Sequence, residues 1–244
     1  MENKKRIIEV CVDSVCNAVV AQSAGASRVE FCAGLPDGGT TPSHAQIEIA
    51  RKQLHIKLYV IIRPRGGDFL YNDTEFEIMK SDIHFCGKTG CDGVVIGMLR
   101  PDGTIDKERN NVLIQIAHHY AMGVTFHRAF DRCDDLFEAM ETIIELGCER
   151  ILTSGGYDTA GEGAEIIRML IEKAGERIVI MPGSGITPEN AQELIQKTGA
   201  KELHGTFRSR FPSRMLYRNK KLSRHDEEYE LLLTDAEKIK YLLQ

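Results

Sequence analysis

Two short segments near the N-terminus carry the same pattern, a glutamate and a cysteine separated by one apolar residue. Glu9 and Cys11 lie in one apolar, β-branched run, and Glu30 and Cys32 end another. Such runs are typical of buried strands, in which residues two apart point to the same face. If the two strands are neighbours, two carboxyl groups and two thiols converge on one spot. A hydrophobic core does not need that set, so these residues are candidates for a functional site.

The thiols of Cys11 and Cys32 occupy equivalent positions in the two predicted strands, so we expect their sulfur atoms to lie close together. Two thiolates suit a soft ion such as Cu(I), which tolerates low coordination. Zinc takes four ligands, and the sequence offers no obvious second pair. The alternative is that both residues are small apolar core side chains, as buried free cysteines often are.

Arginines follow two of the predicted strands. Together with the two glutamates they form a set of charges expected at one end of the sheet: Glu9, Glu30, Arg63, Arg65 and Arg128. Burying a lone charge costs several kcal/mol, so these groups should be paired. They predict either a structural ion-pair network or a clamp for an anion, since arginine binds carboxylate and phosphate groups bidentately.

Two histidines and a glycine-rich turn also follow predicted strands. His127 could transfer protons or bind a metal, and His204 is a second candidate, although either could be a packing residue. The turn Gly183-Ser184-Gly185 precedes a helix start and could bind phosphate or another anion, with Ser154 after the preceding strand. A tight turn alone would need the same glycines.

Composition is that of an ordinary soluble domain. The chain has 244 residues and a formal net charge of −5, which gives no basic surface for nucleic acid. The charged start, residues 1–6, is not followed by a long apolar segment, so we expect neither a secretory signal nor a membrane span. The seven cysteines form no Cys-x-x-Cys pair, which indicates reduced thiols in the cytoplasm.

The elements that must position these residues alternate along the chain. Strands are expected at 6–12, 28–32, 57–62, 93–99, 123–126, 150–152, 177–181 and 202–203, with helices such as 45–53, 106–120, 134–146 and 162–173 between them. Eight strand–helix units predict a single-domain (β/α)8 barrel over about residues 6–210, followed by a C-terminal extension over about 213–244. An open doubly wound sheet is the alternative, but no Gly-x-Gly follows the first strand.

Helix starts are indicated by a hydroxyl residue before proline at Thr41-Pro42 and at Thr187-Pro188. A capping box, Thr234 to Glu237, predicts a helix at the C-terminus. Because barrel enzymes carry their reactive groups at the carboxyl ends of the strands, all the candidates above are expected to meet there. No lysine lies at such an end, which disfavours a Schiff-base aldolase.

Several of these segments together resemble the CutC copper homeostasis family. The matching motifs are EVCVDS at 9–14, EFCAGL at 30–35, GGTTPS at 38–43, RPRGGDF at 63–69, TFHRAFD at 125–131, LTSG at 152–155 and MPGSGI at 181–186. The resemblance implies a (β/α)8 barrel, a cytoplasmic location, a homo-oligomer (dimer or tetramer) and a role in copper handling. It places the Cu(I) ligands on Cys11 and Cys32.

Two functions therefore follow. The first is a Cu(I)-binding protein of copper homeostasis, with no organic cofactor and no nucleic-acid or membrane partner. The second is an enzyme for a small anionic or phosphorylated metabolite, in which Arg63, Arg65 and the turn at 183–185 hold the anion. In that case His127 and either Glu9 or Glu30 would carry protons. A purely structural barrel is a third possibility.

Overall fold

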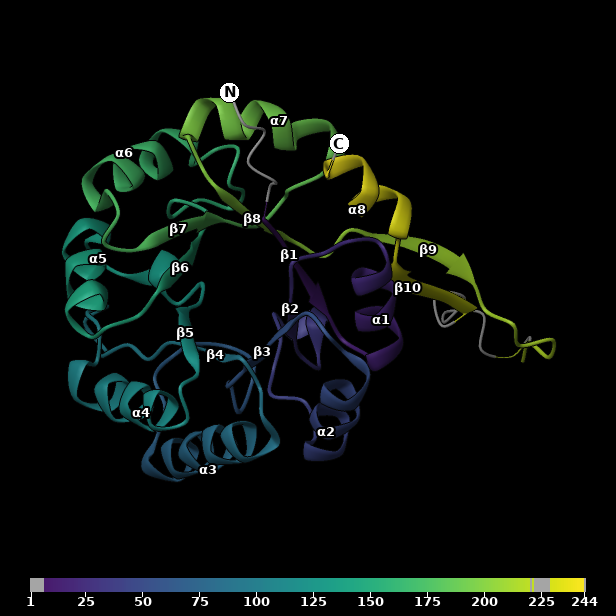
Figure 1. Ribbon diagram of the computed structural model, residues 1–244, viewed down its shortest axis with the longest axis horizontal. Helices are drawn as coiled ribbons and strands as arrows, with labels where there is room; N and C mark the ends of the chain where they lie inside the picture. The colour runs from purple at the N-terminus through teal and green to yellow at the C-terminus, as the bar shows by residue number, and fades with distance from the viewer. Residues whose placement is uncertain (1–6, 220, 222–228, 244) are drawn as a thin grey trace.

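The computed structural model describes residues 7–219, 221 and 229–243, which form a (β/α)8 barrel (Figure 1). The inner wall consists of β1 (Ile7–Val12), β2 (Arg28–Phe31), β3 (Lys57–Ile61), β4 (Gly93–Ile96), β5 (Gly123–Phe126), β6 (Arg150–Thr153), β7 (Val179–Pro182) and β8 (Glu202–Gly205). These strands are all parallel and run in the order β7-β6-β5-β4-β3-β2-β1-β8. Since β7 and β8 also contact each other, the sheet curves back on itself. The predicted barrel is confirmed, and the open sheet is excluded.

Helices surround this wall, as the ring in Figure 1 shows. They are α1 (Val15–Ser23), α2 (His44–Gln53), α3 (Asp73–Thr89), α4 (Lys107–His119), α5 (Leu136–Glu145), α6 (Ala164–Ala174) and α7 (Pro188–Thr198). Among the described helices, none is both long and apolar enough to cross a membrane.

Two of the three predicted helix starts differ from the structure. Thr187 caps α7 as predicted, with Pro188 as its first residue. Helix α2, however, is capped by Ser43 in a capping box, because the hydroxyl of Thr41 accepts a hydrogen bond from the Arg63 backbone instead. The C-terminal helix α8 (Ala236–Leu242) is capped by Asp235, because Thr234 is the last residue of a strand.

Strand β4 is shorter than predicted, ending at Ile96 rather than near residue 99. Beyond Gly97 the backbone bonds elsewhere: the Met98 N–H donates to the Asn110 side chain, and the Leu99 N–H donates to the Phe69 carbonyl. The apolar run therefore continues in the sequence beyond the point where the hydrogen bonds between the strands end.

Alternate residues of the strands belong to two different cores. Ile8, Val10 and Val12 join the large core beneath the helices. A second, small core inside the barrel contains Cys11, Cys32, Tyr59, Ile61 and Val95. The residues between the outward-facing valines of β1 are therefore the ones that point toward the barrel axis.

The register of β1 and β2 differs from the predicted match of the two Glu-x-Cys segments. Cys11 lies level with Glu30, and Glu9 lies level with Arg28, so the segments are displaced by two residues. Such a stagger between neighbouring strands is required to close a barrel. The prediction that the two Glu-x-Cys segments lie level with each other is therefore wrong, although both thiols face the barrel interior as predicted.

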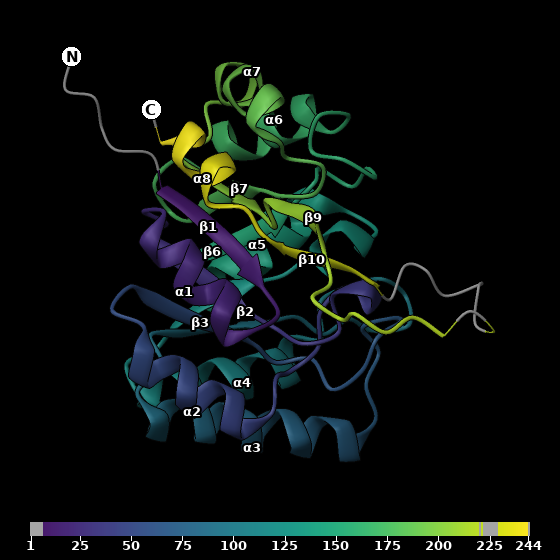
Figure 2. The same cartoon turned by 90° about the vertical axis from the view of Figure 1, so that its right-hand side faces the viewer.

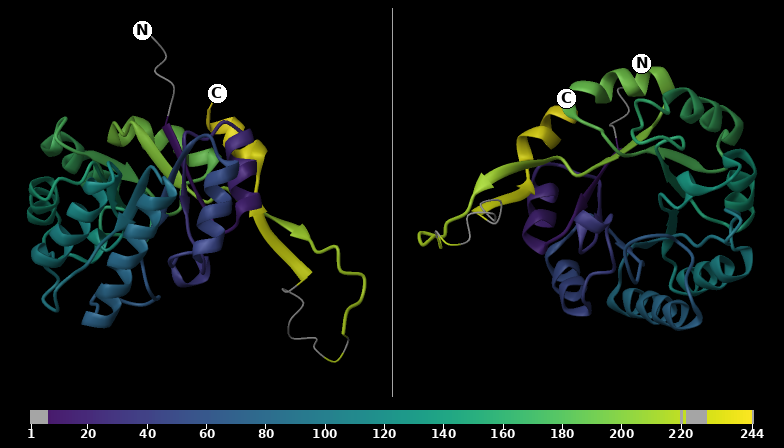
Figure 3. Two further views of the ribbon diagram at one scale, coloured as in Figure 1. Left: turned by 60° about the horizontal axis from the view of Figure 1, so that its bottom comes forward. Right: turned by 180° about the vertical axis from the view of Figure 1, so that it is seen from behind.

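The C-terminal extension begins with an antiparallel hairpin of β9 (Arg208–Pro212) and β10 (Glu230–Thr234). This hairpin projects from the side of the barrel (Figures 2 and 3), while α8 packs against α1 and α7. Exposed apolar side chains lie on the hairpin and beside it: Phe211, Met215, Leu216, Tyr217, Leu231, Leu232 and Leu233.

Candidate functional site

A pocket of about 1050 Å³ lies at the carboxyl ends of the barrel strands. Each of the eight strands, or the loop after it, contributes lining residues: Cys11, Glu30, Ile61, Leu99, His127, Leu152, Ser184 and His204 are one example from each. The strand ends do converge, as expected for this fold.

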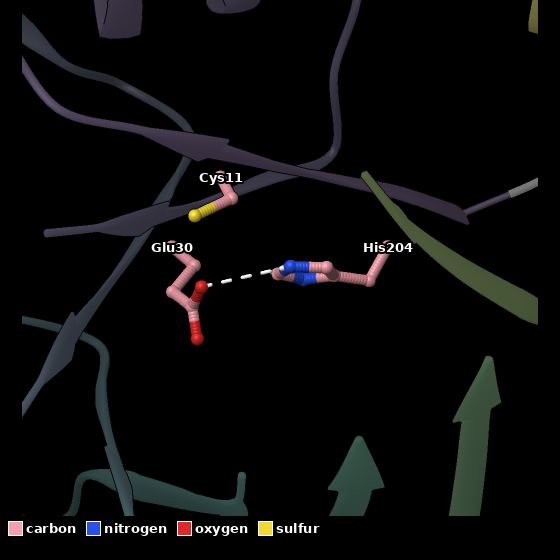
Figure 4. A group of neighbouring side chains, drawn as sticks. All are labelled: Cys11, Glu30 and His204. Atoms are coloured by element: carbon pink, nitrogen blue, oxygen red, sulfur yellow. Dashed lines mark ion pairs between the residues drawn. The ribbon is translucent and has the colours of Figure 1, made fainter. Parts of the chain in front are cut away.

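Cys11, Glu30 and His204 form a compact group at this pocket (Figure 4). One ligand atom of each lies within 4.8 Å of the others, and all three side chains are buried. The Cys11 and Cys32 sulfurs are 3.7 Å apart. Cys32 does not line the pocket and lies behind Cys11, 3.3 Å from the carbonyl oxygen of Val12.

His204 is held between two carboxyl groups. Its Nδ1 lies 2.8 Å from Oε1 of Glu9, and its Nε2 lies 3.6 Å from Oε2 of Glu30. Burial lowers the pKa of His204, but Glu30 and Glu9 outweigh burial and raise it above its usual value. Burial likewise raises the pKa of Glu30. The result is an oriented imidazole whose Nδ1–H donates to Glu9 and whose Nε2 is directed toward the Glu30 carboxyl group.

Glu9 does not pair with the arginines at the strand ends. It pairs with Arg28, which also bonds Glu202 at 2.7 Å, and Arg150 bonds the same Glu202 oxygen at 2.7 Å. Burial raises the pKa of Glu9, but Arg28 and His204 outweigh it and lower the pKa to about 2. These four charges form a network in the barrel interior, called here the buried network: Glu9, Arg28, Arg150 and Glu202.

Three members of the buried network were not predicted from the sequence. Arg28, Arg150 and Glu202 lie at the starts of their strands, the end opposite to the one where functional groups were sought. A usable signal was present, because the three strands each begin with a charged residue.

The three arginines predicted to pair with Glu9 and Glu30, or to hold an anion, have other partners. Arg63 bonds only backbone carbonyl oxygens, those of Asp37, Gly39 and Gly67. Arg65 is not among the pocket-lining residues and pairs instead with Glu75 and Asp68. The prediction of one paired network of these arginines with Glu9 and Glu30 is therefore wrong.

Arg128 lines the pocket, but its charge is paired with a carboxylate on the same loop. It pairs with Asp131 at 2.7 Å and donates to the hydroxyl of Ser154 at 2.7 Å. Ser154 in turn donates to the Tyr157 carbonyl and does not line the pocket. These contacts tie together the loops after β5 and β6.

The residues of the turn after β7 differ in what they contact. Gly183 packs tightly, because a Cβ there would lie 2.5 Å from Leu152, and its N–H donates to the Thr153 carbonyl. Ser184 and Gly185 both have positive φ and line the pocket. The Ser184 hydroxyl donates to the backbone carbonyl of Asp158. Only the second half of the turn therefore faces the pocket.

His127 lines the pocket but differs from His204 in every contact. Its Nδ1 accepts a hydrogen bond from the Ala129 N–H at 3.2 Å, and its Nε2 has no hydrogen-bond partner among the described residues. Burial and the nearby charge of Arg63 lower its pKa to about 3. His127 is thus a neutral imidazole and a weak base at physiological pH, and its predicted part in proton transfer stays a prediction.

The fold and the pocket define a (β/α)8-barrel protein with thiol, imidazole and carboxyl groups at the carboxyl ends of its strands. The family model of the CutC family matches residues 6–209, and this chain belongs to that family. The predicted resemblance is confirmed.

Relatives of known name cover nearly the whole chain. It is 47% identical over 240 residues to the human copper homeostasis protein cutC homolog, covering 97% of this chain and 87% of that protein. It is 47% identical over 241 residues to the family protein CutC of Parabacteroides distasonis, covering 97% and 98%. The crystal structure of CutC from Streptococcus agalactiae superposes with a TM-score of 0.78 at 38% identity, covering 82% of this chain and 98% of that one.

Proposed function

We propose that this protein binds Cu(I) through Cys11 and Cys32 and serves copper homeostasis, as the names of its relatives suggest. The observation that supports this best is the 3.7 Å separation of the two sulfur atoms beside the pocket. Thiolates are the ligands that Cu(I) prefers.

The separation also bears on the coordination. With thiolate–metal bonds of about 2.3 Å, as in zinc sites, a linear arrangement would need sulfurs about 4.6 Å apart. The shorter distance between Cys11 and Cys32 favours a bent arrangement with room for a third ligand. The imidazole of His204 is a nearby donor of a type that suits copper, whereas the Glu30 carboxylate is a hard ligand and suits Cu(I) poorly.

Replacing both cysteines with serine is expected to weaken Cu(I) binding by at least about 100-fold, because a hydroxyl is a poor ligand for a soft ion. Competition with a Cu(I)-specific chelator under anaerobic conditions measures this. Cys16→Ser is the matched control, because Cys16 is exposed and outside the pocket. Equal affinity of the double variant and the unaltered protein would refute the proposal.

A second function is supported by the size of the pocket. About 1050 Å³ is far more than a single ion occupies and is typical of a small-molecule site. The chain Glu9–His204–Glu30 has the arrangement of an acid–base group whose imidazole is oriented by a carboxylate. We propose as the second candidate an enzyme that acts on a small anionic metabolite, with His204 and Glu30 moving the proton.

For this second function, small carboxylates and phosphates are expected to raise the melting temperature of the metal-free protein. Once a substrate is found among them, Glu30→Gln should lower kcat about 10²- to 10⁴-fold with KM little changed, because proton transfer is lost while the pocket keeps its shape. Glu75→Gln, outside the pocket, is the control. A panel without any thermal shift would count against an enzyme.

We propose a cytoplasmic location and self-association of the chain. All seven cysteines are free thiols, which supports a reducing compartment such as the cytoplasm. The exposed apolar residues of the β9–β10 hairpin support association with a second copy of the chain.

A further inference from the structure

The charge of Arg63 is buried and lacks a counterion. Its side chain is 4% exposed, and none of the carboxylates that the structure describes lies within ion-pair distance of it. Its two terminal nitrogens donate to three uncharged carbonyl groups. Its Nε forms no hydrogen bond among the described residues, although the guanidinium interacts with the hydroxyl of Tyr71, which is uncharged at neutral pH. The other buried arginines, Arg28 and Arg150, are both paired with glutamates. A buried, fixed and uncompensated cation is a site for an anion.

His127 provides a second unpartnered donor in the same pocket. Because Nδ1 accepts from the Ala129 N–H, the proton of the neutral ring resides on Nε2. That nitrogen is buried without a partner in the described part of the chain, on a side chain that is 3% exposed. A buried N–H left unsatisfied is unfavourable, so an acceptor brought by a ligand would be stabilising here.

The side chains of Arg63 and His127 lie near each other in the pocket. Arg63 follows β3, His127 follows β5, and Gly97 directly follows β4, the strand between them. A Cβ at Gly97 would lie 2.6 Å from the His127 ring, so glycine leaves the space that this ring occupies. Phe69 adjoins both side chains, with its ring 5.1 Å from the Arg63 guanidinium carbon and 4.9 Å from the His127 ring.

We propose that Arg63 and His127 form a subsite for one carboxylate group of a small organic acid, with the Arg63 guanidinium as the cation and Nε2 of His127 as a donor. The subsite itself selects the class of ligand: one cation and one neutral donor match a singly charged carboxylate, whereas a dianion such as phosphate would keep an uncompensated charge there. The subsite rests on the second proposed function, for which it names the substrate class. It requires no metal.

The subsite is tested by binding rather than turnover. Pyruvate and lactate are titrated into metal-free protein by isothermal titration calorimetry, with inorganic phosphate as the comparison anion. We expect His127→Phe to weaken carboxylate binding at least about tenfold, while His127→Gln, which keeps an N–H donor, stays within about threefold. Arg63→Met should weaken it by more than tenfold, and Arg65→Met, whose charge lies outside the pocket, should not.

Each outcome separates the subsite from the function. Carboxylate binding that is equal in His127→Phe and the unaltered protein would overturn the subsite while leaving an anion-binding pocket in place. Phosphate binding tighter than carboxylate binding would also overturn it and would move the anion site to the β7 and β8 loops. If none of the three anions binds the unaltered protein, both the subsite and the small-anion function fail.

Discussion

Arg28→Met is expected to lower the free energy of unfolding by about 3–5 kcal/mol, because it removes one partner of a buried ion pair and leaves charges without compensation. Glu9 is completely buried and Glu202 nearly so, and both bond Arg28. Methionine fills a similar volume, so the loss reports the missing charge rather than a cavity. Urea denaturation at pH 7, followed by circular dichroism, measures the difference.

The pH dependence of this deficit has a definite sign. The pKa of Glu9 is lowered from 4.5 to about 2, so the stability from its charged form is complete above pH 4.5 and is lost as the pH falls toward 2. The deficit of Arg28→Met should therefore be largest near neutral pH and shrink below pH 4.5. Arg168→Met, which removes an exposed arginine of α6, is the control and should leave the urea midpoint unchanged. If the two variants unfolded at the same urea concentration, the buried network would be energetically unimportant.

Gly93→Ala is expected to destabilise the barrel by about 3 kcal/mol or more, because a Cβ there would lie 2.2 Å from the ring of Tyr59. The ring cannot easily move away. It is almost fully buried inside the barrel, its hydroxyl donates to Glu149, and Gly123 leaves room for that hydroxyl on the next strand. Thermal unfolding of the purified variant measures the loss.

Two further variants identify the cause. Gly161→Ala, in a loop where a Cβ would have no close neighbour, should leave the unfolding temperature unchanged. Tyr59→Leu should cost less on the Gly93→Ala background than on the unaltered protein, because it removes the clash. Additive losses in the double variant would mean that the ring is not what requires glycine at 93.

The barrel could be predicted from sequence because its signals are local. Apolar runs and capping residues recur at regular intervals, and such periodicity survives without knowledge of long-range contacts. The same reasoning correctly placed Cys11 and Cys32 close together, because alternation along a strand fixes which residues share a face.

The predictions failed where they depend on the register between neighbouring strands or on the direction in which a long side chain points. The stagger of β1 and β2 brings Glu9 level with Arg28 and Cys11 level with Glu30, and no pattern within either strand encodes that offset. Arg65 follows its strand like Arg63, yet turns outward to Glu75 on α3. Long flexible side chains choose among partners that only the assembled fold supplies.

The placement of the two inner thiols has a consequence for their chemical durability. The pKa of the Cys11 thiol is raised by its hydrogen bond with Cys32, by burial and by the Glu30 carboxyl group, so the reactive thiolate is scarce there. Peroxides and alkylating agents attack thiolates at exposed positions first, and Cys16 is such a position on the outside of the barrel. Under oxidative stress, Cys16 is therefore expected to react before the two sulfurs that a soft metal would seek.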